Sequence, residues 1–330
     1  MNTLGLSFRV SIFGESHGDC VGVVIDGCPA GLALSADDLA ADIDRRKPGG
    51  LGGTPRREAD VPEIRSGVLD GRTTGAPLAI LFENQNARSG DYEALRNIPR
   101  PGHADLVARI KFGGFNDPRG GGPFSGRLTL PLVAAGTVAR KLLAPATLEA
   151  VLLEVGGSTD IDGTVRSAAA DGDSVGGLVE CRGSGFPPGI GEPFFDAVES
   201  LIAHAVLAIP GIAGIEFGAG FAVSKMRGSA CNDVPVDAAG HTKTNNSGGA
   251  NGGITNGNEL VFRVAVKPPS SIRREQESVD LATGLPVRVS VPGRHDACVA
   301  LRVPVVIEAA AAIVLADLLL RQQLISRIAR

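Results

Sequence analysis

The sequence is poor in aromatic residues. Of its 330 residues none is Trp, one is Tyr, and aromatic side chains make up only 4%. With so few aromatic side chains, we expect no base-stacking platform for single-stranded nucleic acid. Its formal net charge of -4 also argues against a protein that holds nucleic acid by bulk electrostatics. We expect no nucleic-acid partner.

Paired cysteines are lacking as well. The chain has five, an odd number with no CxxC spacing: Cys20, Cys28, Cys181, Cys231 and Cys298. This pattern predicts neither a disulfide framework nor a zinc site, and it fits a reducing compartment. No basic segment followed by an apolar one marks a signal peptide at the N-terminus. The most apolar stretch, 303–320, contains Glu308 and Asp317, so it predicts a core helix rather than a membrane span. We expect a soluble, cytoplasmic protein with no membrane partner.

Glycine and arginine are abundant instead. The 45 glycines are close to twice the usual share of about 7%, and without a collagen-like period they mark turns and sites where the backbone approaches a ligand. Of the 32 basic residues, 26 are Arg. Arginine binds carboxylates and phosphates bidentately, which hints at a polyanionic ligand. A GC-rich coding bias would give the same excess, and composition alone favours that explanation.

The pattern of strands and helices predicts an α/β protein. Strands are expected at 8–13, 21–25, 77–82, 212–223, 260–266 and 287–291, and helices at 36–46, 131–143, 194–208 and 304–327. Segments 47–75 and 84–127 are expected to be long loops. Segments 26–43 and 183–202 share a strand, a Gly/Pro turn and a helix, which suggests a weak internal repeat of βαβ-type units. No linker divides the chain, so residues 1–330 are expected to form a single compact domain.

Three histidines lie in loops that are rich in glycine and charge. They occur in GESHGD (14–19), RPGHAD (100–105) and GRHDAC (293–298). Each has acids nearby, and a histidine beside a carboxylate is a natural proton donor near neutral pH. His204 falls in an apolar helical pattern and is expected to be packed, while His241 is expected to be solvated. Because no HxxxH or HExxH spacing is present, we expect no metal site.

The segment GGFNDPRGGGPFSGR (113–127) is the clearest phosphate-binding signal. Its glycines can turn backbone N–H groups toward an anion, and Arg119, Ser125 and Arg127 can add donors. It is neither a Walker A motif nor a dinucleotide fingerprint. A second glycine-rich element, 246–257, precedes the strand that leads to KPPSS (267–271). Together these segments predict two anionic ligands and several proton donors.

In these motifs the chain resembles the chorismate synthases. The resemblance rests on the histidine motifs in their order along the chain, on DRRKPG (44–49), on SGVLDGRTTGAPLA (66–79), on NGGITNG (251–257) and on KPPSS (267–271). It covers nearly the whole chain. It implies a β-α-β sandwich fold and the 1,4-elimination of phosphate from 5-enolpyruvylshikimate 3-phosphate, which yields chorismate. This is the last common step of aromatic amino-acid biosynthesis.

The resemblance also implies a cofactor and an assembly. The reaction is redox-neutral but requires reduced FMN. NADPH would be needed only by a bifunctional enzyme that reduces its own flavin, and no extra segment for NADPH is apparent. We therefore expect the monofunctional type, with an external reductant. The family is typically homotetrameric.

Residue roles follow from the same resemblance. His17 matches the histidine that protonates the departing phosphate, His103 the one that acts near flavin N1, and Asp296 the acid that helps remove the C6 proton through flavin N5. Substrate anions are expected to be held by Arg46, Arg127 and Arg294. The expected FMN-binding residues are Arg46, Pro123, Phe124, Ser125, Gly252, Lys267, Pro268, Pro269, Ser270, Ser271 and Arg294.

The chain departs from the family pattern at several positions. Many members read GGGRSS where this chain has Pro123 and Phe124, and many place an arginine where it has Gly52, for which Arg56 or Arg57 could substitute. These changes leave open an alternative: a degraded homologue that binds flavin or anions without turnover. Retention of all three proton-handling residues argues against it.

Overall fold

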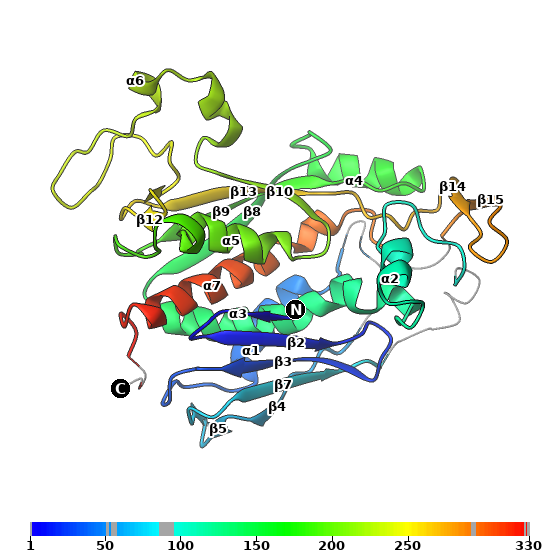
Figure 1. Cartoon of the computed structure of the whole chain (residues 1–330), viewed down its shortest axis with the longest axis horizontal. Coiled ribbons are helices and arrows are strands. Elements are labelled where there is room, and N and C mark those ends of the chain that lie inside the picture. Colours follow the sequence, from blue (N-terminus) through cyan, green and yellow to red (C-terminus); the bar gives the residue numbers. More distant parts are fainter. Residues whose placement is uncertain are drawn as a thin grey trace.

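Two antiparallel sheets with helices between them form the body of the molecule (Figure 1). The computed structural model describes residues 2–50, 53, 58–85, 96–291, 295–326 and 328. In spatial order, the first sheet contains β1 (Thr3–Leu4), β2 (Arg9–Gly14), β3 (Cys20–Asp26), β7 (Leu78–Glu83) and β4 (Glu63–Ser66). The second contains β10 (Ile212–Phe217), β13 (Leu260–Val266), β9 (Gly177–Ser184) and β8 (Thr147–Val155). This layered arrangement confirms the α/β class.

Two hydrophobic helices fill the space between the sheets: α3 (Thr129–Leu143) and α7 (Pro304–Arg321) (Figure 1). Every residue of α7 from Val305 to Leu319 is buried, as expected for a helix that is hydrophobic on all sides. Helix α5 (Val198–Leu207) packs against α7 and β10, and α1 (Asp37–Arg46) packs against α3. The buried side chains of both sheets and these helices form one continuous hydrophobic core.

The two acids of α7 are buried and fully engaged. Glu308 pairs with Arg45 at 2.7 Å and Arg140 at 2.9 Å, which ties α7 to α1 and α3. Asp317 accepts the backbone N–H groups of residues 6, 7 and 8 at 2.6 to 2.9 Å. A buried carboxylate is stable only with such partners. The prediction of a core helix is confirmed, and among the described residues no helix is long and apolar enough to cross a membrane.

Other predictions need correction. The expected loop 47–75 contains β4, β5 (Val68–Leu69) and β6 (Arg72–Thr73), and the expected loop 84–127 contains α2 (Asp105–Lys111). Strand β8 and helix α4 (Ile161–Ala170) were not expected, and β9 was expected only where it enters segment 183–202. The final helix ends at Arg321, where the polar pair Gln322 and Gln323 leaves the core. Both segments of the suggested repeat do run from a strand into a helix. However, βαβ units have parallel strands, whereas the strand pairs of both sheets are antiparallel.

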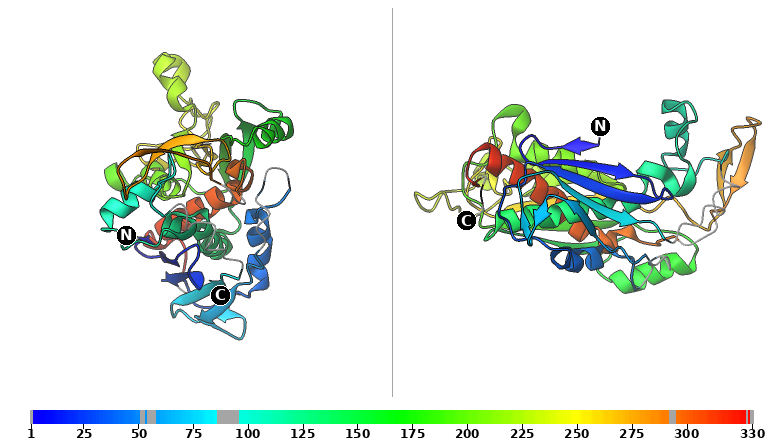
Figure 2. Two further views of the ribbon diagram at one scale, coloured as in Figure 1. Left: turned by 90° about the vertical axis from the view of Figure 1, so that its right-hand side faces the viewer. Right: turned by 90° about the horizontal axis from the view of Figure 1, so that it is seen from below.

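Smaller elements project from this body. The segment around α6 (Gly228–Cys231) extends away from the second sheet, and the hairpin of β14 (Gln276–Val279) and β15 (Pro286–Val289) stands at the same end as α2 (Figures 1 and 2). The hairpin of β11 (Ala250–Asn251) and β12 (Ile254–Thr255) lies at the opposite end from α2 (Figure 1). Strand β2, helix α5 and strand β13 end near α2, and α3 and α7 begin there. Their loops form the site described next.

Candidate active site

A cavity of about 600 Å³ lies where these elements meet. Its walls come from the segments that follow β2, α1, α5 and β13, and from the segments that precede α3 and α7. Its size is typical of a site for small molecules. One wall is apolar, built from residues 207–212 with Pro268, Pro269 and Val299, whereas the remainder is dominated by charged and hydroxyl side chains.

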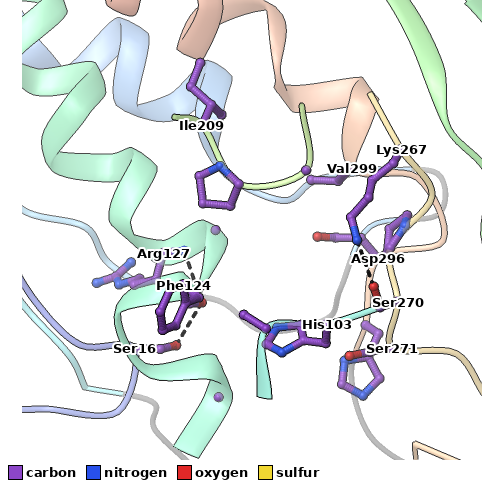
Figure 3. A pocket seen from close by; sticks show the side chains of 18 of the residues that line it. Ser16, His103, Phe124, Arg127, Ile209, Lys267, Ser270, Ser271, Asp296 and Val299 are labelled. Atoms are coloured by element: carbon purple, nitrogen blue, oxygen red, sulfur yellow. Dashed lines mark hydrogen bonds between the residues drawn. The ribbon is translucent and has the colours of Figure 1, made fainter. Parts of the chain in front are cut away.

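All three predicted proton-handling residues line this cavity. His17 follows β2, His103 lies just before α2, and Asp296 precedes the short 3₁₀ helix η6 (Val299–Arg302) that leads into α7. In Figure 3, His103 lies between Ser16 and Phe124 on one side and Lys267 and Ser270 on the other. Residues almost 280 positions apart in sequence are therefore brought to one cavity.

A network of hydrogen bonds holds the His103 ring. Its Nδ1 lies 2.6 Å from Asp105 Oδ1, and Arg100 donates from Nε and Nη2 to the two Asp105 oxygens at 2.7 and 2.8 Å. Arg100 also donates from Nη1 to Ser271 Oγ at 3.0 Å, which connects this network to the KPPSS segment. With Nδ1 occupied, Nε2 is the ring nitrogen left for chemistry. The expected pairing of a histidine with a neighbouring acid is confirmed for His103.

The Asp105 carboxylate should make stability depend on pH. Burial raises its pKa, but hydrogen bonds from Arg100 and His103 outweigh this, and the net effect lowers the pKa well below its usual value. Because an unfolded aspartate titrates near about 3.9, the carboxylate stabilises the fold above that pH, and this contribution is lost as the pH falls toward the folded pKa. We expect Asp105→Asn to lower the urea midpoint at pH 7, with a smaller deficit at pH 3. An equal deficit at both pH values would contradict this role.

A buried cluster joins the two arginines predicted to hold substrate. Asp60 accepts from Arg46 Nη1 at 3.3 Å and from Arg127 Nη1, and all three side chains are at most 5% exposed. Burial lowers the pKa of Arg46, the Arg302 and Arg127 guanidinium groups add to this, and Asp60 opposes it. Two guanidinium groups share one carboxylate here, so this wall of the cavity carries an uncompensated positive charge.

The fork of Arg127 is occupied by the protein itself. Besides Asp60, it donates from Nε to Asn84 Oδ1 at 2.9 Å and from Nη2 to the Glu83 carbonyl at 3.3 Å. Lysine keeps the charge but cannot reach these partners together. We therefore expect Arg127→Lys to lower the free energy of unfolding by about 1–3 kcal/mol in urea titrations. The control is Arg119→Lys, since Arg119 is half exposed and pairs locally with Asp117. Equal stability of the two variants would show that the Arg127 fork is dispensable.

Most of the predicted flavin-binding residues lie together. The cavity lining includes Arg46, Pro123, Phe124, Ser125, Lys267, Pro268, Pro269, Ser270 and Ser271. Lys267 Nζ donates to the Gly102 carbonyl at 2.6 Å and to Ser270 Oγ at 3.1 Å, so its ammonium group is held at the cavity edge (Figure 3).

Other predicted positions do not join this group. Gly252 is in the turn between β11 and β12, and none of residues 246–257 lines the cavity. Arg119 and the rest of 113–119 are also absent from the lining. Arg294, Gly52, Arg56 and Arg57 lie outside the described residues.

Several lining residues carry chemistry that the sequence analysis did not assign. Ser16 accepts a hydrogen bond from Ser125 Oγ at 3.2 Å, and Arg302 Nη2 lies 2.5 Å from Asp296 Oδ2. Ser16 lies in the motif GESHGD and Arg100 in RPGHAD, so these two motifs could have marked both residues as part of the site. Asp60 comes from a segment without periodicity or a motif, and no such signal marked it.

The described part of the cavity carries more positive than negative side chains. The cations are Arg46, Arg100, Arg127, Lys267 and Arg302, and the carboxylates in or directly behind the wall are Glu58, Asp60, Asp105 and Asp296. The three histidines His17, His103 and His295 add capacity for further positive charge. In a chain of net charge -4, such a local excess favours an anionic ligand.

The two remaining histidines lie elsewhere. His204 is on the exposed face of α5, so the expectation that it is packed was wrong. Its neighbours Ile202 and Ala205 are buried, but His204 itself is exposed. His241 is exposed, as expected, and its Nδ1 lies 2.7 Å from Asp237 Oδ2. No cluster of three or more metal-ligating side chains occurs in the described part of the chain.

A cavity that gathers imidazole, carboxylate and an excess of cationic side chains has the groups that an enzyme needs to move protons on a small polyanionic molecule. Residues 8–320 match the family model described as chorismate synthase. A chorismate synthase of Chitinophaga pinensis is 59% identical over 329 residues, covering 99% of both chains, and one of Korarchaeum cryptofilum is 44% identical over 349 residues, covering 96% of this chain and 97% of its own. A structure titled "Crystal Structure of Chorismate Synthase" has a TM-score of 0.75 and 27% identity, covering 96% of this chain and 93% of that one. The chain belongs to the chorismate synthase family, the lyases that convert 5-enolpyruvylshikimate 3-phosphate to chorismate in the shikimate pathway.

Proposed function

We propose that this cavity holds 5-enolpyruvylshikimate 3-phosphate beside reduced FMN, and that His17, His103 and Asp296 handle the protons of the elimination. The observation that carries the proposal is the convergence of these three side chains on one cationic cavity. A 1,4-elimination needs an acid where phosphate leaves and a base where the C6 proton leaves. An imidazole and a carboxylate on one cavity supply both.

His17 is the proposed acid. Its side chain is buried, with 8% of the residue exposed, and it lies beside the backbone of Gly120 and follows Ser16. A donated proton converts the departing phosphate to a better leaving group. Arg46, with its guanidinium only partly balanced by Asp60, attracts the phosphate or carboxylate groups of the substrate to the same wall.

Asp296 is the proposed final acceptor of the C6 proton. Arg302 fixes one of its carboxylate oxygens through the ion pair at 2.5 Å. This ion pair keeps the carboxylate in one orientation, so Asp296 can accept the proton without changing its rotamer. Arg294, two residues earlier, is proposed to bind the same anions, and its position lies outside the described residues.

The residues present fit FMN. Lys267, Ser270 and Ser271 supply the donors that a phosphate monoester needs. The apolar wall of 207–212, Pro268, Pro269 and Val299, together with the separate side chain of Phe124, suits a flat ring system. When bound, reduced FMN supplies the electron-rich partner that this redox-neutral elimination requires. His103 is held at Nδ1 by Asp105, so its Nε2 is the ring nitrogen that would hold a proton beside the flavin. We propose Gly252 as a further FMN contact on the resemblance alone.

Pro123 and Phe124 favour one alternative, a homologue that binds flavin without turnover. Phe124 lines the cavity at a position where many relatives have a hydroxyl. An anaerobic assay with FMN and dithionite distinguishes the two hypotheses. An active enzyme should form chorismate, whereas a homologue that only binds flavin would form none. The same assay with NADPH alone tests the proposed monofunctional type, which should remain inactive without an external reductant.

We further propose that the enzyme is a cytoplasmic homotetramer. Each chain forms one domain over 1–330. Within it, the two segments that run from a strand through a turn into a helix, 26–43 and 183–202, are related repeats. Exposed Phe194, Phe195 and Phe221, each more than 80% accessible, support burial of more surface by association. Light scattering should give about four times 33.7 kDa. A mass equal to one chain at all concentrations would contradict the tetramer.

A further inference from the structure

A run of three glycines lies against two of the histidines of the cavity, His17 and His103. Gly120, Gly121 and Gly122 have φ values of +59°, +85° and +52°, all in the left-handed region that favours glycine. The loop is fixed to the end of β2, because the Ser16 N–H donates to the Gly122 carbonyl at 3.2 Å. The loop therefore lies directly against the segment that carries His17.

The first two glycines each contact one imidazole ring. A Cβ atom on Gly120 would lie 2.5 Å from Cδ2 and 2.7 Å from Nε2 of His17. A Cβ atom on Gly121 would lie 3.1 Å from Cε1 and 3.2 Å from Nε2 of His103. Ordinary van der Waals contact begins near 3.4 Å. A methyl group would thus displace the His17 ring by about 1 Å and the His103 ring by a few tenths of an ångström.

Both rings are restrained on their other sides. His103 is held by Asp105 and Arg100, as described above, and His17 is a buried residue. The atoms nearest to an added Cβ belong to the His103 ring at Gly121, and at Gly120 to the His17 ring, followed by Ser16 Oγ at 3.0 Å. A side chain at either glycine would therefore press mainly on a ring, at the edge that carries Nε2.

We propose that Gly120 and Gly121 are positioning residues whose missing side chains set where the His17 and His103 rings lie. This inference rests on the proposed roles of the two histidines. It gives the glycine run a second use besides presenting N–H groups to an anion, since here the glycines make room for acid–base side chains. The glycines act through the histidines and are not catalytic themselves.

The chain offers controls matched in backbone geometry. Gly113 has φ of +61° and its nearest neighbour to an added Cβ is 3.7 Å away, while Gly114 has φ of +85° and no neighbour within 4 Å. Neither lines the cavity. Gly113→Ala thus places a side chain at nearly the same positive φ as Gly120→Ala but without the clash, and Gly114→Ala does the same for Gly121→Ala. Comparing each pair isolates the effect of the ring contact.

The turnover of these variants is the first readout. With saturating reduced FMN, we expect Gly120→Ala to lose about 10²-fold in turnover, since a misplacement of about 1 Å costs that much. Gly121→Ala should lose less, because its clash is milder. Gly113→Ala and Gly114→Ala should stay within about twofold of the unaltered enzyme. If Gly120→Ala matches Gly113→Ala while His17→Ala is inactive, the positioning role is wrong and the role of His17 stands.

A double-mutant cycle on stability tests the contact without using activity. We expect Gly120→Ala to lower the melting temperature more than Gly113→Ala, and most of that excess to vanish in a His17→Ala background, where no ring remains. If Gly120→Ala alone does not fold, recovery of folded protein in the double variant with His17→Ala supports the proposal. Failure of the double variant to fold contradicts it. An excess that persists without the ring would also overturn it. Because the cycle requires no turnover, it stays decisive even if His17 proves not to be the acid.

Discussion

Replacing His17 with alanine should lower turnover by about 10²-fold or more, the usual range for loss of a general acid. The side chain lines the cavity beside Gly120, and His103 cannot replace it without leaving its own partners, Asp105 and Arg100. The affinity for FMN should hardly change, since the proposed flavin contacts come from 123–125 and 267–271. Steady-state chorismate formation and an FMN titration measure the two effects separately.

His204→Ala is a suitable control for this experiment, because His204 is exposed on α5 and does not line the cavity. It should retain full turnover. Added imidazole should partly restore His17→Ala, because the variant leaves a space of the right size and chemistry. An unchanged turnover number in His17→Ala would remove His17 from the mechanism.

Asp296→Asn should also lower turnover by about 10²-fold or more, with little effect on the binding of substrate or FMN. Asparagine is nearly isosteric and its amide oxygen still accepts a hydrogen bond from Arg302, but it cannot take up a proton. Binding isotherms for both ligands beside single-turnover chorismate formation distinguish loss of chemistry from loss of affinity.

The alternative role of Asp296 is to anchor an arginine, and the structure identifies Arg302 as its partner. Arg302→Gln therefore breaks the same pair from the other side. If Asp296 were only an anchor, the two variants would weaken ligand binding to a similar extent, and turnover would fall in step. If Asp296 accepts the proton, Asp296→Asn retains binding and loses turnover far more than Arg302→Gln. Asp173→Asn, which affects an exposed surface pair, is the neutral control.

The candidate site was largely predictable because its chemistry is concentrated in short motifs. His17, His103 and Asp296 each stand in a glycine-rich, charged loop, and the structure places all three on one cavity. The buried connections between the motifs were not predictable. Asp60 joins Arg46 and Arg127 across 14 and 67 residues, and Arg100 reaches Ser271 across 171 residues. Such pairs depend on how the loops pack, which no local pattern encodes.

The fold was predicted unevenly for a similar reason. Strand β13 was expected at 260–266, and its alternating buried residues explain why. Helix α2 was missed because only Ala108 of its seven residues is buried, so it carries no apolar stripe. Strands β4 to β6 are two to four residues long, too short for a period to appear. His204 illustrates the opposite error, since apolar neighbours on α5 concealed a position on its exposed face.

The most direct test of the account is one anaerobic turnover with the unaltered enzyme, FMN reduced by dithionite, and 5-enolpyruvylshikimate 3-phosphate, with chorismate and inorganic phosphate measured together. Both products should appear in equal amounts and at the same rate, because one cavity removes the phosphate and the C6 proton of the same molecule. Saturable binding of substrate and FMN without either product would contradict it. So would release of phosphate without chorismate, because the cavity would then be hydrolysing the ester rather than eliminating it.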